Sequence, residues 1–173
     1  MPRVYEKKKF NMGRDYHCGR CGRKIEPGEQ YFSWSFRYGG TRTNCAGHRP
    51  RPSELTQSKM AEVYAAIESA EDTLESAETV AEMREAIESV AEQVQQTAEE
   101  YREADEAFGG MGATESAERA DELESWASDL EYYDPDEPDE PDEDDDEEEE
   151  DDGSDALEDA RNEAQDLLNN CPL

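Results

Sequence analysis

The sequence Cys18-Gly-Arg-Cys21-Gly22, with Cys45-Ala-Gly-His48 further along, decides the fold of the first part of this chain. Two residues separate the members of each pair, a spacing that lets both side chains point at one ion. A hairpin between the pairs would close a tetrahedron of three thiolates and one imidazole, a donor set that suits Zn²⁺. We therefore predict a structural zinc site with Cys18, Cys21, Cys45 and His48 as its ligands. Reduced cysteines or a disulfide are the alternative.

Charge divides the chain into two unequal parts. Residues 1–52 carry 12 Lys and Arg against 4 Asp and Glu, whereas residues 53–173 carry 5 against 44. A basic head predicts an anionic partner, and an acidic body predicts solubility, self-repulsion or competition for that partner. No apolar run is long enough for a signal peptide or a membrane helix, so we expect an intracellular protein, cytoplasmic or, for a viral chain, in the host cytoplasm.

Period-two alternation over residues 31–38 predicts a β-strand in the head. Residues 39–40, both glycine, predict a tight turn with positive φ angles, after which residues 41–43 return as the partner strand. One face of the strand has three large aromatic side chains, which we expect to cover the metal: Phe32, Trp34 and Phe36. Tyr31 and Arg37 belong to the opposite face, where they are freer to meet a partner.

The stretch 18–28, which reads C-G-R-C-G-R-K-I-E-P-G, resembles the opening of treble-clef zinc fingers of the LIM and poly-ADP-ribose-polymerase types. The resemblance covers residues 16–50, although those families order the second pair His-x-x-Cys and this chain has Cys45-x-x-His48. It implies a zinc-built binding module, a shape shared by DNA-end readers and protein-interaction modules. HNH-type nucleases also use the treble clef, but their additional histidines have no counterpart here, where His17 could only replace His48 as a ligand.

Basic and aromatic side chains make the head a candidate surface for DNA or RNA. Lysines and arginines can hold phosphates without reading sequence, and an aromatic ring can stack on a base. The candidates are Lys7, Lys8, Lys9, Arg20, Arg23, Lys24, Tyr31, Arg37 and Arg42. The alternative is that the lysine run is a solvated tail and the aromatic rings only build a core around the metal. A shared exposed face for the arginines would favour nucleic acid.

Residues 53–133 are rich in Ala and Glu, with apolar residues at the three-four spacing of amphipathic helices. Ser53 is the expected N-cap of the first helix, and Thr79 with Glu82 forms a capping box that starts the second. A third helix begins near Thr114, after a glycine-rich loop. We predict a slim three-helix coiled-coil bundle whose alanine-rich core is small enough to favour a homodimer. A simple spacer with a solvated acidic surface is the alternative.

Residues 134–153 form an acidic linker. From Asp134 to Asp152, 16 of 19 residues are acidic and the rest are proline, so the segment cannot bury enough apolar surface to fold and is predicted to be disordered. It could compete for the surface of the head or mimic nucleic acid toward a basic protein, or it could serve only solubility. Residues 154–170 predict one short amphipathic helix, which could dock on the bundle or in a partner's groove. Cys171 is expected to be an unpaired thiol.

These patterns favour a non-enzymatic, zinc-binding accessory or regulatory protein of the kind that a compact phage genome encodes. Its head contacts nucleic acid, and its acidic body and tail modulate that contact. The alternatives are a protein-protein adaptor that oligomerises or recruits through its helices, and an acidic DNA mimic that inhibits a basic partner. An enzyme is disfavoured because four protein ligands leave no open position on the metal, and no nucleophile-base pairing is visible.

Overall fold

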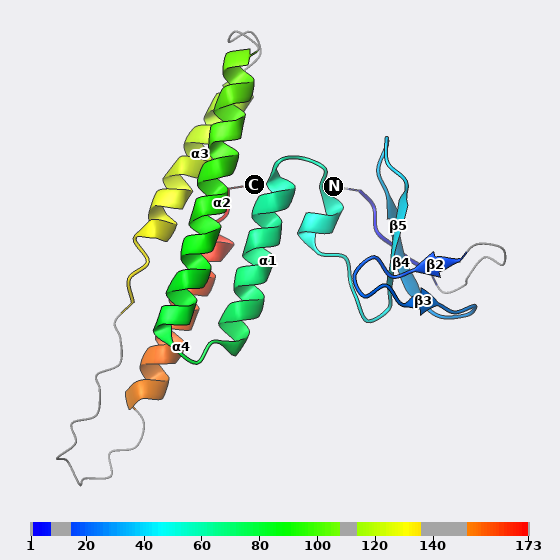
Figure 1. Cartoon of the computed structure of the whole chain (residues 1–173), viewed down its shortest axis with the longest axis horizontal. Helices are drawn as coiled ribbons and strands as arrows, with labels where there is room; N and C mark the ends of the chain where they lie inside the picture. Colours follow the sequence, from blue (N-terminus) through cyan, green and yellow to red (C-terminus); the bar gives the residue numbers. More distant parts are fainter. Residues whose placement is uncertain (1, 8–14, 108–113, 136–151, 173) are drawn as a thin grey trace. The chain divides into compact units, whose positions relative to one another are not determined.

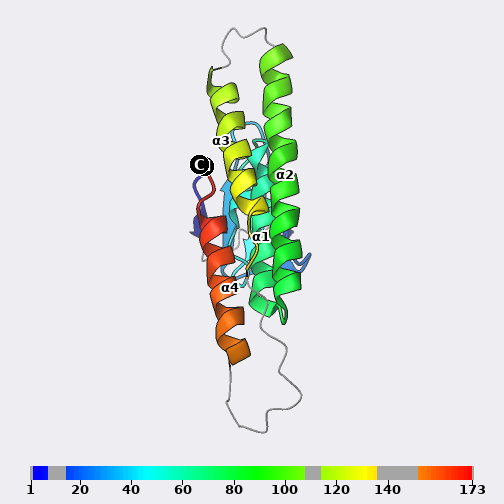
Figure 2. The same cartoon turned by 90° about the vertical axis from the view of Figure 1, so that its left-hand side faces the viewer.

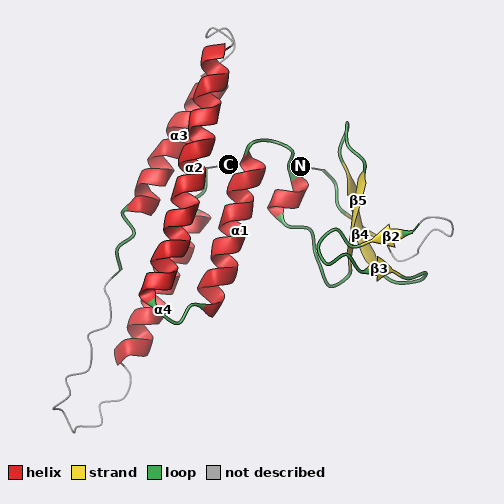
Figure 3. Ribbon diagram, in the orientation of Figure 1, coloured by secondary structure: helices red, strands yellow, loops and turns green. Residues whose placement is uncertain are grey.

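Two compact units make up the chain: a head of residues 1–61 and a helical unit of residues 62–173. The computed structural model describes the following residues: 2–7, 15–107, 114–135 and 152–172. Within them, short strands and one 3-10 helix come first and four α-helices follow (Figures 1 and 3). The predicted order of a small β module followed by helices is therefore confirmed.

The head is built on a three-stranded antiparallel sheet in the order β1-β4-β5. These strands are β1 (Tyr5–Lys7), β4 (Tyr31–Ser35) and β5 (Thr41–Cys45), and a separate small hairpin joins β2 (Tyr16–His17) to β3 (Lys24–Ile25). The predicted strand and its returning partner are confirmed, since residues 31–35 pair with residues 41–45 in continuous register. β5 lies at the edge of the sheet.

The connection between β4 and β5 differs from the predicted two-residue turn, whereas a tight turn does form at Gly28. Residues 39–40 do not have the expected positive φ, because the whole stretch 36–40 forms the connection and a longer loop does not need a two-residue turn. The turn at Gly28 follows its sequence: Gly28 has φ +93°, and the Glu29 N–H donates to the Glu26 carbonyl at 3.1 Å.

The face of β4 that meets the cysteine cluster is not the one that we predicted. Tyr31 was expected on the freer face, yet it is only 6% exposed, because its cross-strand partner is Cys45 and that face meets the cysteine cluster. Trp34 and Phe32 lie on the other face, so they do not cover the cluster. Trp34 is buried there, and its indole N–H donates to the Glu54 backbone carbonyl at 3.0 Å.

The first α-helix begins later than its sequence suggests. Residues 52–55 form the 3-10 helix η1, so Ser53 is not an N-cap, and α1 starts at Met60. The reason is a long-range contact: the Glu54 carboxylate accepts hydrogen bonds from the Asn44 side chain of β5. Residues 52–55 are thereby held against the sheet and do not continue into a helix.

The four helices are α1 (Met60–Ser76), α2 (Val80–Ala107), α3 (Thr114–Glu131) and α4 (Asp152–Asn169). The predicted break between the first two is confirmed. The Glu82 N–H donates to the Thr79 hydroxyl at 3.2 Å, and the Glu82 carboxylate accepts from the Glu78 N–H at 2.9 Å. The first bond satisfies an amide group that the first turn of α2 would leave without a partner, and the second holds the residue that precedes the N-cap.

Successive helices of the helical unit run antiparallel to one another, and α4 packs with the other three (Figure 2). Hydrogen bonds fix their register through these pairs: Glu62 with Gln93, Arg102 with Asp121, Trp126 with Leu167, and Leu74 with Arg161. The interior is aliphatic and alanine-rich, as in the fully buried Val63, Ile87, Ala98, Leu123 and Ala164. The C-terminal helix thus docks on the bundle, one of the two alternatives that its sequence left open, and the predicted three-helix bundle is corrected to one of four helices.

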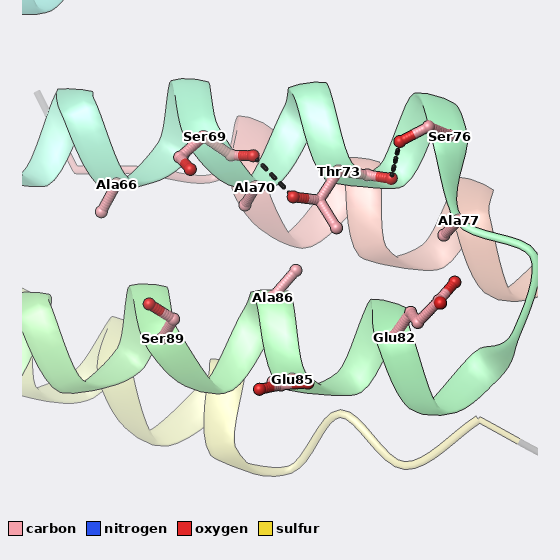
Figure 4. Close-up of a pocket in the computed structure, with 10 residues that line it drawn as sticks. All are labelled: Ala66, Ser69, Ala70, Thr73, Ser76, Ala77, Glu82, Glu85, Ala86 and Ser89. Atoms are coloured by element: carbon pink, nitrogen blue, oxygen red, sulfur yellow. Dashed lines mark hydrogen bonds between the residues drawn. The ribbon is translucent and has the colours of Figure 1, made fainter.

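A groove of about 400 Å³ separates part of α1 from α2 (Figure 4). Small side chains such as Ala66, Ala70 and Ala86 line it, and they leave space that larger aliphatic residues would fill. The Thr73 hydroxyl does not bridge the groove, because it donates back to the Ser69 carbonyl of its own helix at 3.0 Å. The sparse packing agrees with the small core expected from the alanine-rich sequence.

Candidate metal centre

The first ligand pair lies in the turn between β2 and β3. The Gly22 N–H donates to the Cys18 carbonyl at 2.9 Å, and the Cys18 N–H donates to the Arg23 carbonyl at 2.8 Å. Gly22 has φ +69°, a left-handed conformation that a β-carbon would make costly. The glycine that follows Cys21 therefore closes the turn that directs both thiols toward one point.

The edge strand β5 delivers the second pair to the first. Cys45 is its last residue, and the His48 N–H donates to the Cys45 carbonyl at 2.9 Å, which turns the histidine back toward the cysteine. A further bond joins the two halves of the site: the Gly19 N–H donates to the Thr43 carbonyl at 2.9 Å. The backbone thus holds both ligand pairs in place from opposite sides.

The ligand atoms of Cys18, Cys21, Cys45 and His48 all lie within 4.8 Å of one another, so the cluster could hold a metal ion. The Nδ1 atom of His48 is 3.5 Å from the Cys18 Sγ and 3.2 Å from the Cys45 Sγ. A tetrahedral site with bonds of about 2.3 Å to sulfur and about 2.0 Å to nitrogen has sulfur-to-nitrogen edges of about 3.5 Å. The observed spacing is close to that value.

Electrostatics favour a bound cation in this cluster. Burial raises the pKa of the Cys18 thiol, but hydrogen bonds from the backbone N–H groups of Cys21, Cys45 and Arg20 outweigh burial and lower the pKa to about 6. The Arg23 N–H lowers the pKa of Cys21, yet the neighbouring thiols of Cys18 and Cys45 raise it overall. Adjacent thiols resist ionising together, and a cation between them removes that repulsion.

A small cluster of apolar side chains packs around the Cys18 and Cys45 thiols. Ile25 is fully buried and packs with Cys18, Cys45 and Tyr31, while the Tyr16 ring stacks on Tyr31 with centroids 5.5 Å apart. So few apolar side chains bury little surface by comparison with an ordinary domain core. A metal bound by the converging ligands would therefore add an important tie to the hydrogen bonds of the sheet.

Two residues behind Cys18 were missed by the sequence analysis. Asn44 is fully buried, with its Oδ1 3.9 Å from the Cys18 Sγ and its Nδ2 3.0 Å from the Glu54 carboxylate. Glu54 also accepts from Arg20 at 2.8 Å and from the Arg51 N–H at 2.9 Å. Burial raises the pKa of Glu54, but hydrogen bonds from Asn44 and Arg51 and the charge of Arg20 bring it below the ordinary value.

A weak sequence signal pointed to Asn44. A short polar residue directly before a ligand in a strand lies on the face opposite that ligand, and once the strand is buried its amide needs a hydrogen-bond partner there. Glu54 had no such signal, because its role depends on the 3-10 helix that the sequence pattern did not reveal.

The predicted nucleic-acid contacts fall into two groups. Three are paired with carboxylates: Arg20 with Glu54 at 2.8 Å, Arg23 with Glu29 at 3.0 Å, and Lys24 with Asp15 at 2.9 Å. Arg37 and Arg42 are exposed and have no carboxylate partner within the described residues. Their guanidinium groups lie over aromatic rings, 5.4 Å from the centroid of Tyr38 and 5.3 Å from that of Phe36.

The remaining candidates are Tyr31 and the three lysines near the N-terminus. Tyr31 is buried beside the cysteine cluster and is not available to a partner. Lys7 is the last residue of β1, whereas Lys8 and Lys9 lie outside the described residues. The acidic linker also falls largely outside them, over residues 136–151, so its predicted disorder stays a prediction.

No helix in the described ranges is both long and apolar enough to cross a membrane. Comparisons of the chain with protein-family models, with curated proteins and with solved structures find no match in any of the three. The likeness to treble-clef fingers therefore rests on the knuckle residues, and what the structure itself shows is a Cys₃His cluster that could hold a metal ion.

Proposed function

We propose that this chain is a non-enzymatic zinc-binding accessory protein whose head contacts nucleic acid. The observation behind the proposal is the pair Arg37 and Arg42, both exposed and without a carboxylate partner among the described residues. The whole chain has a net charge of −31, so acidic groups are abundant. Arginines that stay unpaired in such a chain are available to an external anion.

Zinc is the metal that we propose for the Cys₃His cluster. Thiolates and imidazole suit Zn²⁺, whereas Mg²⁺ and Ca²⁺ need oxygen ligands. Four protein ligands leave no coordination position for water or substrate, which favours a structural role. The metal would then tie the β2–β3 knuckle to β5 and supply folding free energy to the head.

The surroundings of the two arginines favour nucleic acid over a simple anion. Arg37 and Arg42 belong to the β4–β5 hairpin, together with Tyr38, which is 89% exposed, and the partly buried Phe36. A guanidinium group binds phosphate through paired N–H donors, and an exposed aromatic ring can stack on a base. Phosphates and bases together match this combination of side chains.

We further propose that the acidic body limits this binding. Residues 53–173 carry 44 Asp and Glu, and the segment 134–153 concentrates many of them. A polyanion in the same chain competes with phosphates for the arginines. Nucleic-acid binding should consequently be weak at physiological salt and fall steeply as salt rises.

The test is a salt titration of the zinc-loaded, full-length chain with labelled single- and double-stranded DNA and RNA. We expect R37Q/R42Q to weaken binding about tenfold or more and to reduce the salt slope by about 2. R102Q/R119Q is the matched control, because it removes the same charge from the helical unit. An equal loss in both variants would contradict the role of the hairpin. Failure of the wild type to bind any nucleic acid at low salt would reject the function and favour the protein-protein adaptor.

A further inference from the structure

A cavity of about 380 Å³ lies in the head, beside the metal cluster. Its wall includes residues 41–44 of the edge strand β5, Gly19 of the knuckle and Glu54 of η1. None of the four metal ligands lines it. Its volume falls within the range of about 300–1,000 Å³ that is common for small-ligand pockets.

Part of the cavity lining is buried, hydrogen-bonded and includes a hydrogen-bond acceptor. Trp34 and Asn44 are 2% and 0% exposed, and both are hydrogen-bonded to Glu54. The Glu54 Oε2 accepts from Arg20, from the Arg51 N–H and from Asn44, whereas within the described residues its Oε1 accepts only from Asn44. A carboxylate oxygen has two lone pairs, so Oε1 can accept one more hydrogen bond from a ligand.

Arg42 supplies the opposite chemistry at the same cavity. It lines the wall, is exposed, and lies over the Phe36 ring with no carboxylate partner in the described part of the chain. A fitting ligand therefore carries an anionic group for Arg42 and an N–H donor for Glu54. A nucleotide whose base has an amino group supplies both: its phosphate is the anionic group, and the amino group is the N–H donor.

We propose that this cavity receives one unpaired nucleotide whose base carries an exocyclic amino group, with the amino group donating to the Glu54 Oε1 and the phosphate bound by Arg42. The inference rests on the proposed nucleic-acid function and names the kind of strand that the head prefers. Cytosine offers such an amino group, and thymine offers a carbonyl in its place. In a duplex the base is stacked and held against its partner, so it cannot enter the cavity, and the strand has to be single or frayed.

The first experiment compares oligo(dC) with oligo(dT) of equal length, bound to the zinc-loaded, full-length chain at neutral pH and low salt. The two probes have the same phosphate charge and similar base size, so only the base edge distinguishes them. We expect oligo(dC) to bind about tenfold more tightly than oligo(dT) and more tightly than its own duplex with oligo(dG). Equal affinity for the two single strands would overturn the inference while leaving the proposed function intact.

A pair of variants locates the effect at the cavity. T41W adds bulk to the cavity wall, whereas S35W adds the same bulk to the cross-strand partner of Thr41, which does not line the cavity. Neither changes charge, and bound zinc confirms that each head is folded. T41W should reduce the preference for oligo(dC) to about one, and S35W should keep it. An unchanged preference in T41W would overturn the inference, and no binding to any probe by the wild type would reject the proposed function as well.

Discussion

The head and the helical unit reach a folded state by different means. Among the described residues up to the end of β5, the head buries few large apolar side chains other than cysteine: Ile25, Tyr31 and Trp34. Four ligand atoms converge on one point there. The helical unit buries a continuous aliphatic stripe along each helix, and its described residues form no cluster suited to a metal. Short segments that bury little apolar surface depend on metal ligation, whereas longer amphipathic helices do not. A change that unfolds one unit should therefore leave the other unit folded.

The largest expected effect follows from removing a ligand. C45S should abolish metal binding and unfold the head, because apparent binding free energies of structural zinc are about 10–16 kcal/mol in zinc-finger peptides. The measurement is a ¹H–¹⁵N NMR spectrum of the full chain, in which resonances of the head collapse and those of the helices stay. C171S is the control, since Cys171 lies outside the cluster. A C45S head that keeps its dispersed resonances would contradict the comparison.

The next largest effect belongs to the helical core. Leu123 is fully buried, so L123A should lower the free energy of unfolding of the helical unit by about 2–5 kcal/mol, without altering metal content. Urea denaturation followed by helical circular dichroism measures this change. L167A, at a half-buried position of α4, should cost less. A loss of bound metal in L123A would show that the two units are coupled.

A smaller effect is expected at the contact that joins α4 to α1. The Arg161 guanidinium donates to the Leu74 carbonyl at 2.8 Å and to the Ala77 carbonyl at 3.0 Å, at a helix end that has no basic residue of its own. R161M should cost about 1–3 kcal/mol, because it leaves carbonyls unpaired and removes a favourable charge. R102M removes only exposed ion pairs and should cost less in the same urea titration. Equal losses of stability in R161M and R102M would contradict the role of Arg161 as a cap of α1.

The smallest effect is a dependence on alkaline pH. Burial raises the pKa of Tyr133 to about 12, and its hydroxyl donates to the Ala160 carbonyl at 2.9 Å. A folded-state pKa above the unfolded value of about 10 means that the neutral phenol stabilises the fold below pH 10 and that this contribution is lost between about pH 10 and 12. Y133F should flatten the pH dependence of stability in that window. The same slope in both proteins would contradict the assignment.

Local features of the head and of the helices could be predicted from the sequence. The knuckle followed from Cys18, Cys21 and Gly22, and the start of α2 followed from the capping box of Thr79 and Glu82, because each depends on residues within one turn. The convergence of Cys18, Cys21, Cys45 and His48 was also predictable, because their two paired spacings indicate it. Such features need no knowledge of the rest of the fold.

Long-range features were harder to predict. Alternation along β4 defines two faces, but only the pairing of Tyr31 with Cys45 shows which of them meets the cysteine cluster. The end of η1 depends on Glu54 binding Asn44 from a strand, so the first helix was placed too early. Docking of α4 depends on its backbone carbonyls meeting Trp126 and Tyr133 of other segments, contacts that no sequence period encodes.

The central claim is that one metal ion, held by three sulfurs and one nitrogen, closes the head. Extended X-ray absorption spectroscopy on the purified full-length chain, with zinc content measured on the same sample, tests it most directly. We predict one zinc per chain, with three sulfur scatterers at about 2.3 Å, one imidazole nitrogen at about 2.0 Å and no oxygen in the inner shell. An oxygen ligand, fewer sulfurs, or a chain that folds its head without bound metal would contradict the account.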